Sequence, residues 1–255
     1  MNNITELTRQ TIKPEARVPE EQIDIGHARH FINRHMSLMQ FNLRVLEQAL
    51  NEDYPLLERF QFLMIFNSNM DEFFEIRLAG LKRQISFARE VISVDGLPPG
   101  DVLQVLGEQC KAATSRQYQI LNEVLLPALE QEKIRVLNRH QWSPEVAVWA
   151  EDYFRHQVMP VISPIGLDPA HPFPRLVNKS LNFIVSLEGK DAFGRDSGMA
   201  IVPAPRSLPR LVRLPDELCV DGDNFVLLSS LMLLLLSLQL LLLSSQVLLL
   251  SSQVL

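Results

Sequence analysis

Asn69, Phe73 and Arg77 are the residues of this chain whose types and spacing indicate chemistry. They recur every four residues within the segment 67–85, so a helix would place all three on one stripe. The other residues at helical spacing are apolar, namely Phe74, Leu78, Leu81 and Ile85, which indicates that the stripe faces a core. An amide and a guanidinium on a buried stripe need partners, because burying either one unpaired is costly. The simplest interpretation is a core amide and a core ion pair.

Helical patterns precede this stripe. Ser37 followed by Gln40 fits a capping box with an apolar face behind it. Pro55 suits the first turn of the next helix, which we expect to run to about Phe66. The polar run 67–69 then predicts a break or kink before a long helix. These patterns predict that the stripe belongs to a helical bundle.

The segment 95–100 is the best linker signal, because its two prolines flanked by glycines cannot continue a helix. After it, a helical pattern over 115–131 contains Pro127, which we expect to kink or divide the helix. Ser143 followed by Pro144 then predicts a clean helix start. The chain beyond residue 100 therefore opens with helices of its own.

Short β-prone runs follow, separated by Pro, Gly and Asp clusters as strands are separated by turns. They lie at 158–162, 181–187, 199–202, 210–214 and 225–228. We therefore predict an α+β fold, an amino-terminal helical bundle followed by an α/β domain with short strands. The predicted domains are a mobile leader over 1–27, a helical domain over 28–100, an α/β head domain over 101–230 and a tail over 231–255.

The tail is leucine-rich and of low complexity. No charged residue follows Asp223, and the block 241–247 repeats unchanged as 248–254. An uncharged apolar stretch of this length would normally predict a transmembrane helix, but no Lys or Arg cluster and no aromatic belt flanks it. We therefore interpret the tail as an altered reading frame or a sequence artefact, with membrane contact as the alternative. On that interpretation, trimming after Ser230 should improve solubility.

Composition and motifs exclude several classes of function. The net charge of −6 argues against general nucleic-acid binding. Cys110 and Cys219 lie far apart and the amino terminus lacks an apolar signal segment, so we expect a cytoplasmic protein with reduced thiols. The ten glycines form no phosphate-binding loop of the P-loop type. His27, His30 and His35 match no standard metal-site spacing.

Several ordered blocks of the chain resemble the amino-terminal part of bacterial polyphosphate kinases of the first family. These blocks are 31–34, 41–47, 55–59, 67–85, 166–174 and 178–182. The resemblance covers roughly residues 28–230. It implies a helical domain followed by a head domain, in an enzyme that transfers the terminal phosphoryl group of ATP to polyphosphate.

The chain departs from the family in two places. Where the family usually reads Arg-Glu-Leu-Ser-Trp-Leu, His35 replaces a carboxylate and Leu38 replaces a tryptophan. The resemblance also stops near Ser230, before the two carboxy-terminal domains that hold the family's phosphorylated histidine and most nucleotide and metal contacts. We therefore assign no catalytic and no metal-binding residue, and we expect the isolated chain to be inactive. Magnesium is expected from the family, with its ligands outside this chain.

The resemblance implies one ATP contact, because an asparagine of the family's ATP site matches Asn69. A side-chain amide offers a donor and an acceptor, which suits the edge of adenine. Eight residues of helix separate Asn69 from Arg77 by about 12 Å along the axis, comparable to the reach from an adenine edge to the phosphates. We therefore predict that Asn69 holds the base and that Arg77 faces the phosphates, with Phe73 between them. A structural ion pair is the alternative for Arg77.

A different class of function stays open beside the enzyme. The chain could be a non-catalytic oligomerisation or interaction module that folds and performs no chemistry. The family resemblance implies ATP and polyphosphate as partners of the full-length enzyme, and a homo-oligomer formed through the head domain.

Overall fold

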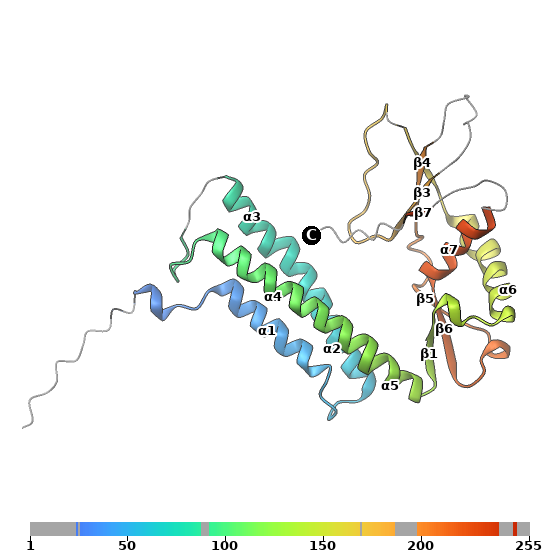
Figure 1. The fold of residues 1–255 in the computed structure, drawn as a ribbon, viewed down its shortest axis with the longest axis horizontal. Helices are drawn as coiled ribbons and strands as arrows, with labels where there is room; N and C mark the ends of the chain where they lie inside the picture. Colours follow the sequence, from blue (N-terminus) through green and yellow to red (C-terminus); the bar gives the residue numbers. More distant parts are fainter. Residues whose placement is uncertain are drawn as a thin grey trace, which may run out of the picture. The chain divides into compact units, whose positions relative to one another are not determined.

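The computed structural model describes residues 24, 26–87, 92–168, 170–186, 198–239 and 247–248 of the chain. The chain divides into two compact units. The helical unit comprises Met1–Asn51 and Glu58–Gln117, and the second unit comprises Glu52–Leu57 and Tyr118–Leu255. Figure 1 colours the chain along its sequence, from blue at the amino terminus to red at the carboxy terminus.

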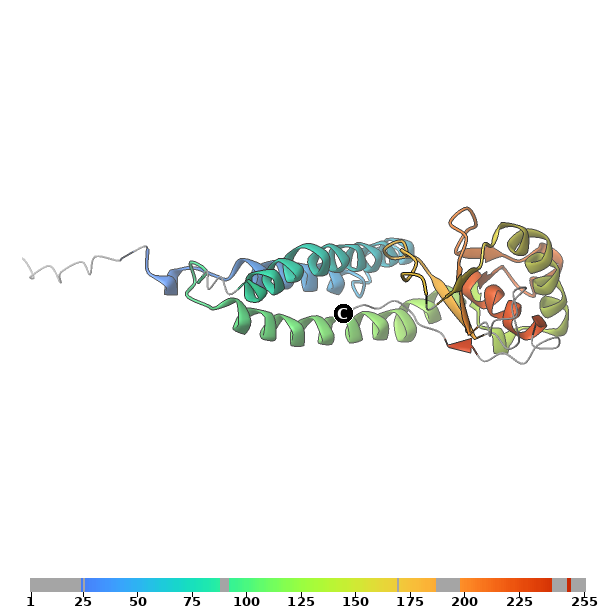
Figure 2. The same ribbon diagram turned by 90° about the horizontal axis from the view of Figure 1, so that it is seen from above.

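The helical unit consists of long helices that run alongside one another, as Figures 1 and 2 both show. Its elements are α1 (Arg34–Gln48), α2 (Leu56–Glu72), a π-helical turn (Phe73–Leu78), α3 (Ala79–Ser86) and α4 (Pro99–Gln119). The π-helical turn joins α2 and α3 without a loop, so the three segments form one long helical rod.

Helix α1 begins earlier than the capping-box prediction placed it. The side-chain oxygen of Asn33 accepts hydrogen bonds from the backbone N–H groups of His35 and Met36, at 2.9 and 3.2 Å. Asn33 is therefore the N-cap, and Ser37 lies inside the first turns of the helix. The prediction from Ser37 and Gln40 was wrong, because an asparagine four residues earlier already satisfies the free N–H groups.

Helix α2 passes through the polar run 67–69 without the predicted break. The amides of this run find partners on neighbouring helices, which removes the reason for the helix to end there. Asn67 Oδ1 accepts from Gln117 Nε2 of α4 at 3.1 Å, and Asn69 Nδ2 donates to Asn42 Oδ1 of α1 at 3.2 Å. The irregularity of the rod lies further on, in the π-helical turn.

Apolar side chains at helical spacing join the helices of this unit. The buried ones include Met39 and Leu46 of α1, Leu63, Phe66 and Met70 of α2, and Val102, Leu106, Cys110 and Ala113 of α4. The sulfur atoms of Cys110 and Met39 lie 4.0 Å apart across α4 and α1. Because the buried stripe of α4 belongs to this core, the helical unit extends to Gln117, beyond the boundary predicted near residue 100.

The second unit combines short strands with helices. Its regular elements are a π-helical turn (Ile120–Leu125), α5 (Leu126–Gln131), β1 (Ile134–Leu137), α6 (Pro144–Tyr153), a second π-helical turn (Phe154–Val158), β2 (Ile165–Leu167), β3 (Asn182–Ser186), β4 (Met199–Pro203), β5 (Leu211–Arg213), β6 (Asp223–Leu227), α7 (Leu228–Gln239) and β7 (Val247–Leu248). One sheet has the order β1-β6-β5, and the other has the order β2-β4-β3-β7. Only the β1–β6 pair is parallel among the pairs described. The α+β fold class is thereby confirmed.

Four of the five predicted strands are present as β3, β4, β5 and β6. The fifth, at 158–162, was wrong, because this segment ends the second π-helical turn and continues as a 3-10 helix. Its apolar residues extend the buried stripe of α6, since Val158 follows Phe154, Ala150 and Val146 at intervals of four. Pro127 falls in the first turn of α5, directly after a π-helical turn, so the helix is widened there and continues.

The beginning of the predicted tail belongs to the core of the second unit. Helix α7 starts at Leu228, and Leu231, Met232 and Leu234 are buried against β-strands and α6. Removing these side chains would expose core, so the structure contradicts the expectation that trimming after Ser230 helps solubility. The repeated block, 241–247 and 248–254, lies outside the described residues except for Val247 and Leu248. Within the described part of the chain, no helix has the length and apolarity needed to span a membrane.

Candidate functional site

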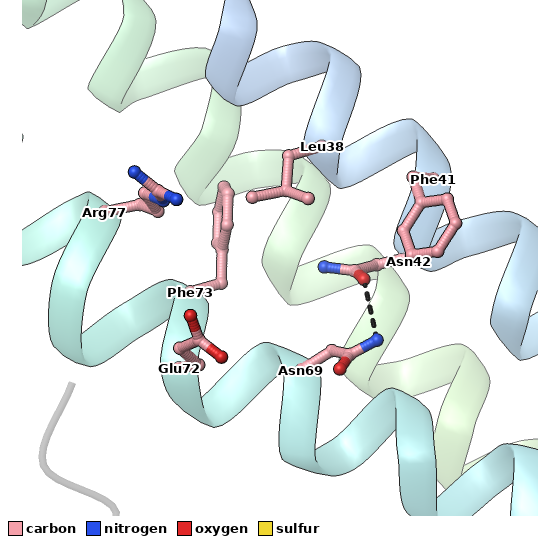
Figure 3. A pocket seen from close by; sticks show the side chains of 7 residues that line it. All are labelled: Leu38, Phe41, Asn42, Asn69, Glu72, Phe73 and Arg77. Carbon is pink, nitrogen blue, oxygen red and sulfur yellow. Dashed lines mark hydrogen bonds between the residues drawn. The ribbon is translucent and has the colours of Figure 1, made fainter.

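A pocket in the helical unit brings the three predicted residues together. It is lined by Leu38, Phe41 and Asn42 of α1, by Asn69 and Glu72 of α2, and by Phe73 and Arg77 of the π-helical turn (Figure 3). Its volume is about 110 Å³. An apolar cavity of about 150 Å³ holds a benzene ring, so this hollow has room for part of one flat ring and no more.

The floor of the pocket is Phe73, whose side chain is only 1% exposed. Asn69 and Arg77 are half-buried, and in Figure 3 they lie on opposite sides of the Phe73 ring. The spacing of four residues therefore places the amide at one end of the pocket and the guanidinium at the other. The rod carries all three residues in one row because α2 runs into the π-helical turn without a loop.

Asn42 and Asn69 form an amide pair at the first end of the pocket. Asn69 Nδ2 donates to Asn42 Oδ1 at 3.2 Å, and Asn42 itself is 2% exposed. The expectation of a core amide is thus correct for the nitrogen of Asn69. Its carbonyl oxygen accepts no hydrogen bond from any residue that the structure describes, and it remains available to a ligand.

Arg77 occupies the other end of the pocket without an ion-pair partner among the described residues. Glu72 lines the same pocket, yet no ion pair joins its carboxylate to the guanidinium. The core ion pair that served as the alternative for Arg77 is therefore not formed within the described residues. A half-buried guanidinium without an internal counter-charge can bind a carboxylate or a phosphate in a bidentate manner.

His35 of α1 adds to the electrostatics at this end. Burial lowers the pKa of His35, the positive charges of Arg77 and Arg34 lower it further, and Asp95 opposes them. The imidazole is therefore neutral near pH 7, and its Nδ1 is buried without a hydrogen-bond partner among the described residues.

The described residues do not fit a metal site. They contain no group of three His, Cys, Asp or Glu side chains that could hold an ion. Glu72 is the single carboxylate that lines the pocket, whereas magnesium is held through oxygen ligands in near-octahedral geometry. Magnesium that takes part in a phosphoryl transfer would need ligands from other groups, such as the nucleotide phosphates.

Comparison with known proteins identifies the family. The sequence model of the polyphosphate kinase N-terminal domain matches residues 31–137, and that of the polyphosphate kinase middle domain matches residues 145–239. The chain belongs to the polyphosphate kinase family. The two matched segments together cover most of the chain and include the pocket.

Relatives of this polyphosphate kinase chain extend well beyond it. The chain is 59% identical to the polyphosphate kinase of Pseudomonas syringae over 202 residues. The aligned segment covers 79% of this chain and 27% of that protein. The enzyme of Neisseria meningitidis serogroup B is 50% identical over 199 residues, 78% of this chain and 29% of that protein. The chain therefore spans less than a third of the length of these relatives.

A solved structure supports the fold. The crystal structure of polyphosphate kinase from Porphyromonas gingivalis matches with a TM-score of 0.69 at 25% identity, covering 86% of this chain and 31% of that one. This likeness agrees with a helical domain followed by a head domain. The middle-domain match extends to residue 239, so the family sequence includes α7 and continues past the limit predicted near Ser230.

Sequence reasoning missed the α1 side of the pocket, above all Asn42. Its signal was present, because an amide at position 42 interrupts the apolar face that Leu38 and Leu46 form at intervals of four. Phe41 and Glu72 offered no such signal, since an exposed aromatic ring and an exposed carboxylate are common on helix surfaces.

Proposed function

We propose that this chain is part of a polyphosphate kinase that transfers the terminal phosphoryl group of ATP to polyphosphate, and that its pocket holds the adenine end of ATP. The observation that carries the proposal is that Asn69, Phe73 and Arg77 line one pocket in the order predicted. Such a transfer needs a group on the base, positive charge on the phosphates and a positioned acceptor. In this proposal the pocket supplies the group that holds the base, and Arg77 supplies one positive charge for the phosphates.

At the base end, Asn69 Oδ1 is a free acceptor and the exocyclic amino group of adenine is a donor. Phe73 is almost fully buried, so it forms the floor against which an edge of the ring rests. Phe41 lines the pocket and is 48% exposed, with the guanidinium of Arg44 over its ring at 5.9 Å from the centroid. A base that stacks on an aromatic ring gains roughly 1–3 kcal/mol.

At the other end, Arg77 faces the phosphates. The row of helix separates it from Asn69 by about 12 Å along the axis, which matches the length of a nucleotide better than that of a bare base. Its missing internal counter-charge supports this role, because phosphate oxygens would complete the pairing of the guanidinium. Oligomerisation, the use of magnesium and a cytoplasmic location belong to the same proposal, and the resemblance to the family is what supports them.

The test uses a full-length enzyme in which residues 31–239 of this chain replace the matching segment of the Pseudomonas syringae polyphosphate kinase. Asn69→Ala should raise the KM for ATP about tenfold, because the base loses its polar partner. Asn67→Ala is the matched control, since Asn67 lies on the same helix, makes one amide hydrogen bond and does not line the pocket. Equal kinetics of the two variants would show that the pocket does not hold the base.

A further inference from the structure

Asn42 is a buried amide on a helix face that is otherwise apolar. It is 2% exposed, and the buried neighbours on its helix are Met39 and Leu46. Burying an amide at such a position costs free energy unless its N–H and C=O groups form hydrogen bonds. The oxygen of Asn42 accepts a hydrogen bond from Asn69. Figure 3 shows the nitrogen of Asn42 directed toward the space between Leu38 and Phe73, on the pocket side.

We propose that Asn42 and Asn69 act as one coupled amide pair that selects adenine over guanine, with Asn42 as the positioning residue. This inference rests on the proposed nucleotide function of the pocket. The hydrogen bond between the two side chains uses one donor and one acceptor. The bond leaves Asn69 Oδ1 as a free acceptor, while Asn69 Nδ2 keeps one N–H group and Asn42 Nδ2 keeps two.

The complement of the free oxygen of Asn69 is a donor on the edge of the base. Adenine offers its N6 amino group there, whereas guanine carries the acceptor O6, which would face that oxygen.

The coupling matters because a lone asparagine discriminates poorly. An amide without a fixed partner rotates to offer its nitrogen or its oxygen, and so it accepts O6 of guanine as readily as N6 of adenine. Asn42 prevents this by holding Asn69 Nδ2. Removing Asn42 should therefore change which base is accepted more than how fast the reaction proceeds.

The experiment compares kcat/KM for ATP with kcat/KM for GTP in the full-length chimeric enzyme described above. Asn42→Leu should reduce the ratio of the two values about tenfold, mainly through KM, while the melting temperature is kept. Asn42→Asp should keep the preference for ATP, because a carboxylate still accepts from Asn69 Nδ2 and leaves the Asn69 oxygen free. This rescue separates a positioning role from a packing role.

Gln117→Leu is the matched control, because it removes the other amide pair between these helices, the one with Asn67, which lies outside the pocket. It should leave the ratio unchanged. Saturation-transfer NMR with adenosine and guanosine repeats the comparison on the 255-residue chain without catalysis. An unchanged ratio in Asn42→Leu, in kinetics and in NMR, would overturn the coupled pair. A KM effect of Asn69→Ala in the same enzyme would show that the nucleotide pocket itself stands.

Discussion

Two rows of side chains in this molecule share one backbone design and differ in chemistry. In the helical unit, Asn69 and Phe73 lead from α2 into a π-helical turn that also carries Arg77. In the second unit, Ala150 and Phe154 lead from α6 into another π-helical turn. Both turns begin with a phenylalanine that is 1% exposed. We call these the pocket row and the core row.

The core row is apolar throughout, and its members Val146, Ala150, Phe154 and Val158 are 4% exposed or less. The pocket row places an amide and a guanidinium on either side of its phenylalanine, and both are half-buried. One row closes a core and the other lines a hollow. A π-helical turn therefore does not by itself mark a functional site, and the two rows differ in the polar groups that have no internal partner among the described residues.

The largest effect should come from removing the partner of the core row. Helix α7 buries Leu231, Met232 and Leu234 in the core that contains Phe154. Trimming the chain after Ser230 removes three buried side chains, a loss of roughly 5 kcal/mol or more, so the second unit should lose its cooperative unfolding transition. Differential scanning calorimetry measures it. Trimming after Gln239 is the control and should keep the transition; an unchanged transition in the shorter chain would contradict the role of α7.

The next effect tests the core row itself. Phe154→Ala should lower the free energy of unfolding by about 3–5 kcal/mol, because it leaves a cavity among buried neighbours. Met159→Ala is the control five residues further on, where the side chain is 48% exposed, and it should cost under about 1 kcal/mol. Urea unfolding followed by circular dichroism compares them. Equal losses would mean that the row does not carry the core.

The sequence shows the spacing of the residues in both rows, but it does not show which elements pack against each row. The spacing of Asn69, Phe73 and Arg77 was enough to place them on one helix face, and their meeting in one pocket needed α1 beside them. The same spacing from Val146 to Val158 was overlooked, because the β-branched residues at 158–162 favour a strand in isolation. Packing against α7 decided for the helix.

Features that join distant segments were beyond sequence reasoning. Strand β1 pairs in parallel with β6, so Ile134 lies beside Asp223, and no local pattern in either segment specifies that partner. The uninterrupted course of α2 depends likewise on Asn42 and Gln117, which hold the amides of the polar run. Local propensity predicted a break there because the polar run was read without those partners.

In the pocket row, Arg77→Gln should act on ATP and not on stability. The guanidinium has no ion pair among the described residues, so its loss should change the free energy of unfolding by less than about 1 kcal/mol. In the chimeric enzyme the KM for ATP should rise about tenfold, because a bidentate phosphate contact is lost. Arg83→Gln, an exposed position on α3, is the control. A loss of several kcal/mol with unchanged ATP kinetics would assign Arg77 to the core.

The smallest effect concerns the pH dependence of the charged end of the pocket row. Burial, followed by the charges of Arg77 and Arg34, lowers the pKa of His35 below its usual 6.5, while Asp95 acts in the opposite direction. Below pH 6.5 the unfolded chain therefore binds a proton at this residue that the folded chain does not bind. The free energy of unfolding should fall as the pH drops from 6.5 toward the folded-state pKa, and the contribution of His35 is complete above 6.5.

Melting temperatures measured between pH 5 and pH 8 test this contribution. His35→Gln should flatten part of the slope. Arg77→Gln should also reduce the slope, because it removes the second cause of the lowered pKa. If His35→Gln leaves the slope as it was while Arg77→Gln changes it, the charge at this end of the pocket acts on another group than His35. The core row contains no ionisable side chain, so Phe154→Ala should shift every melting temperature without changing the slope.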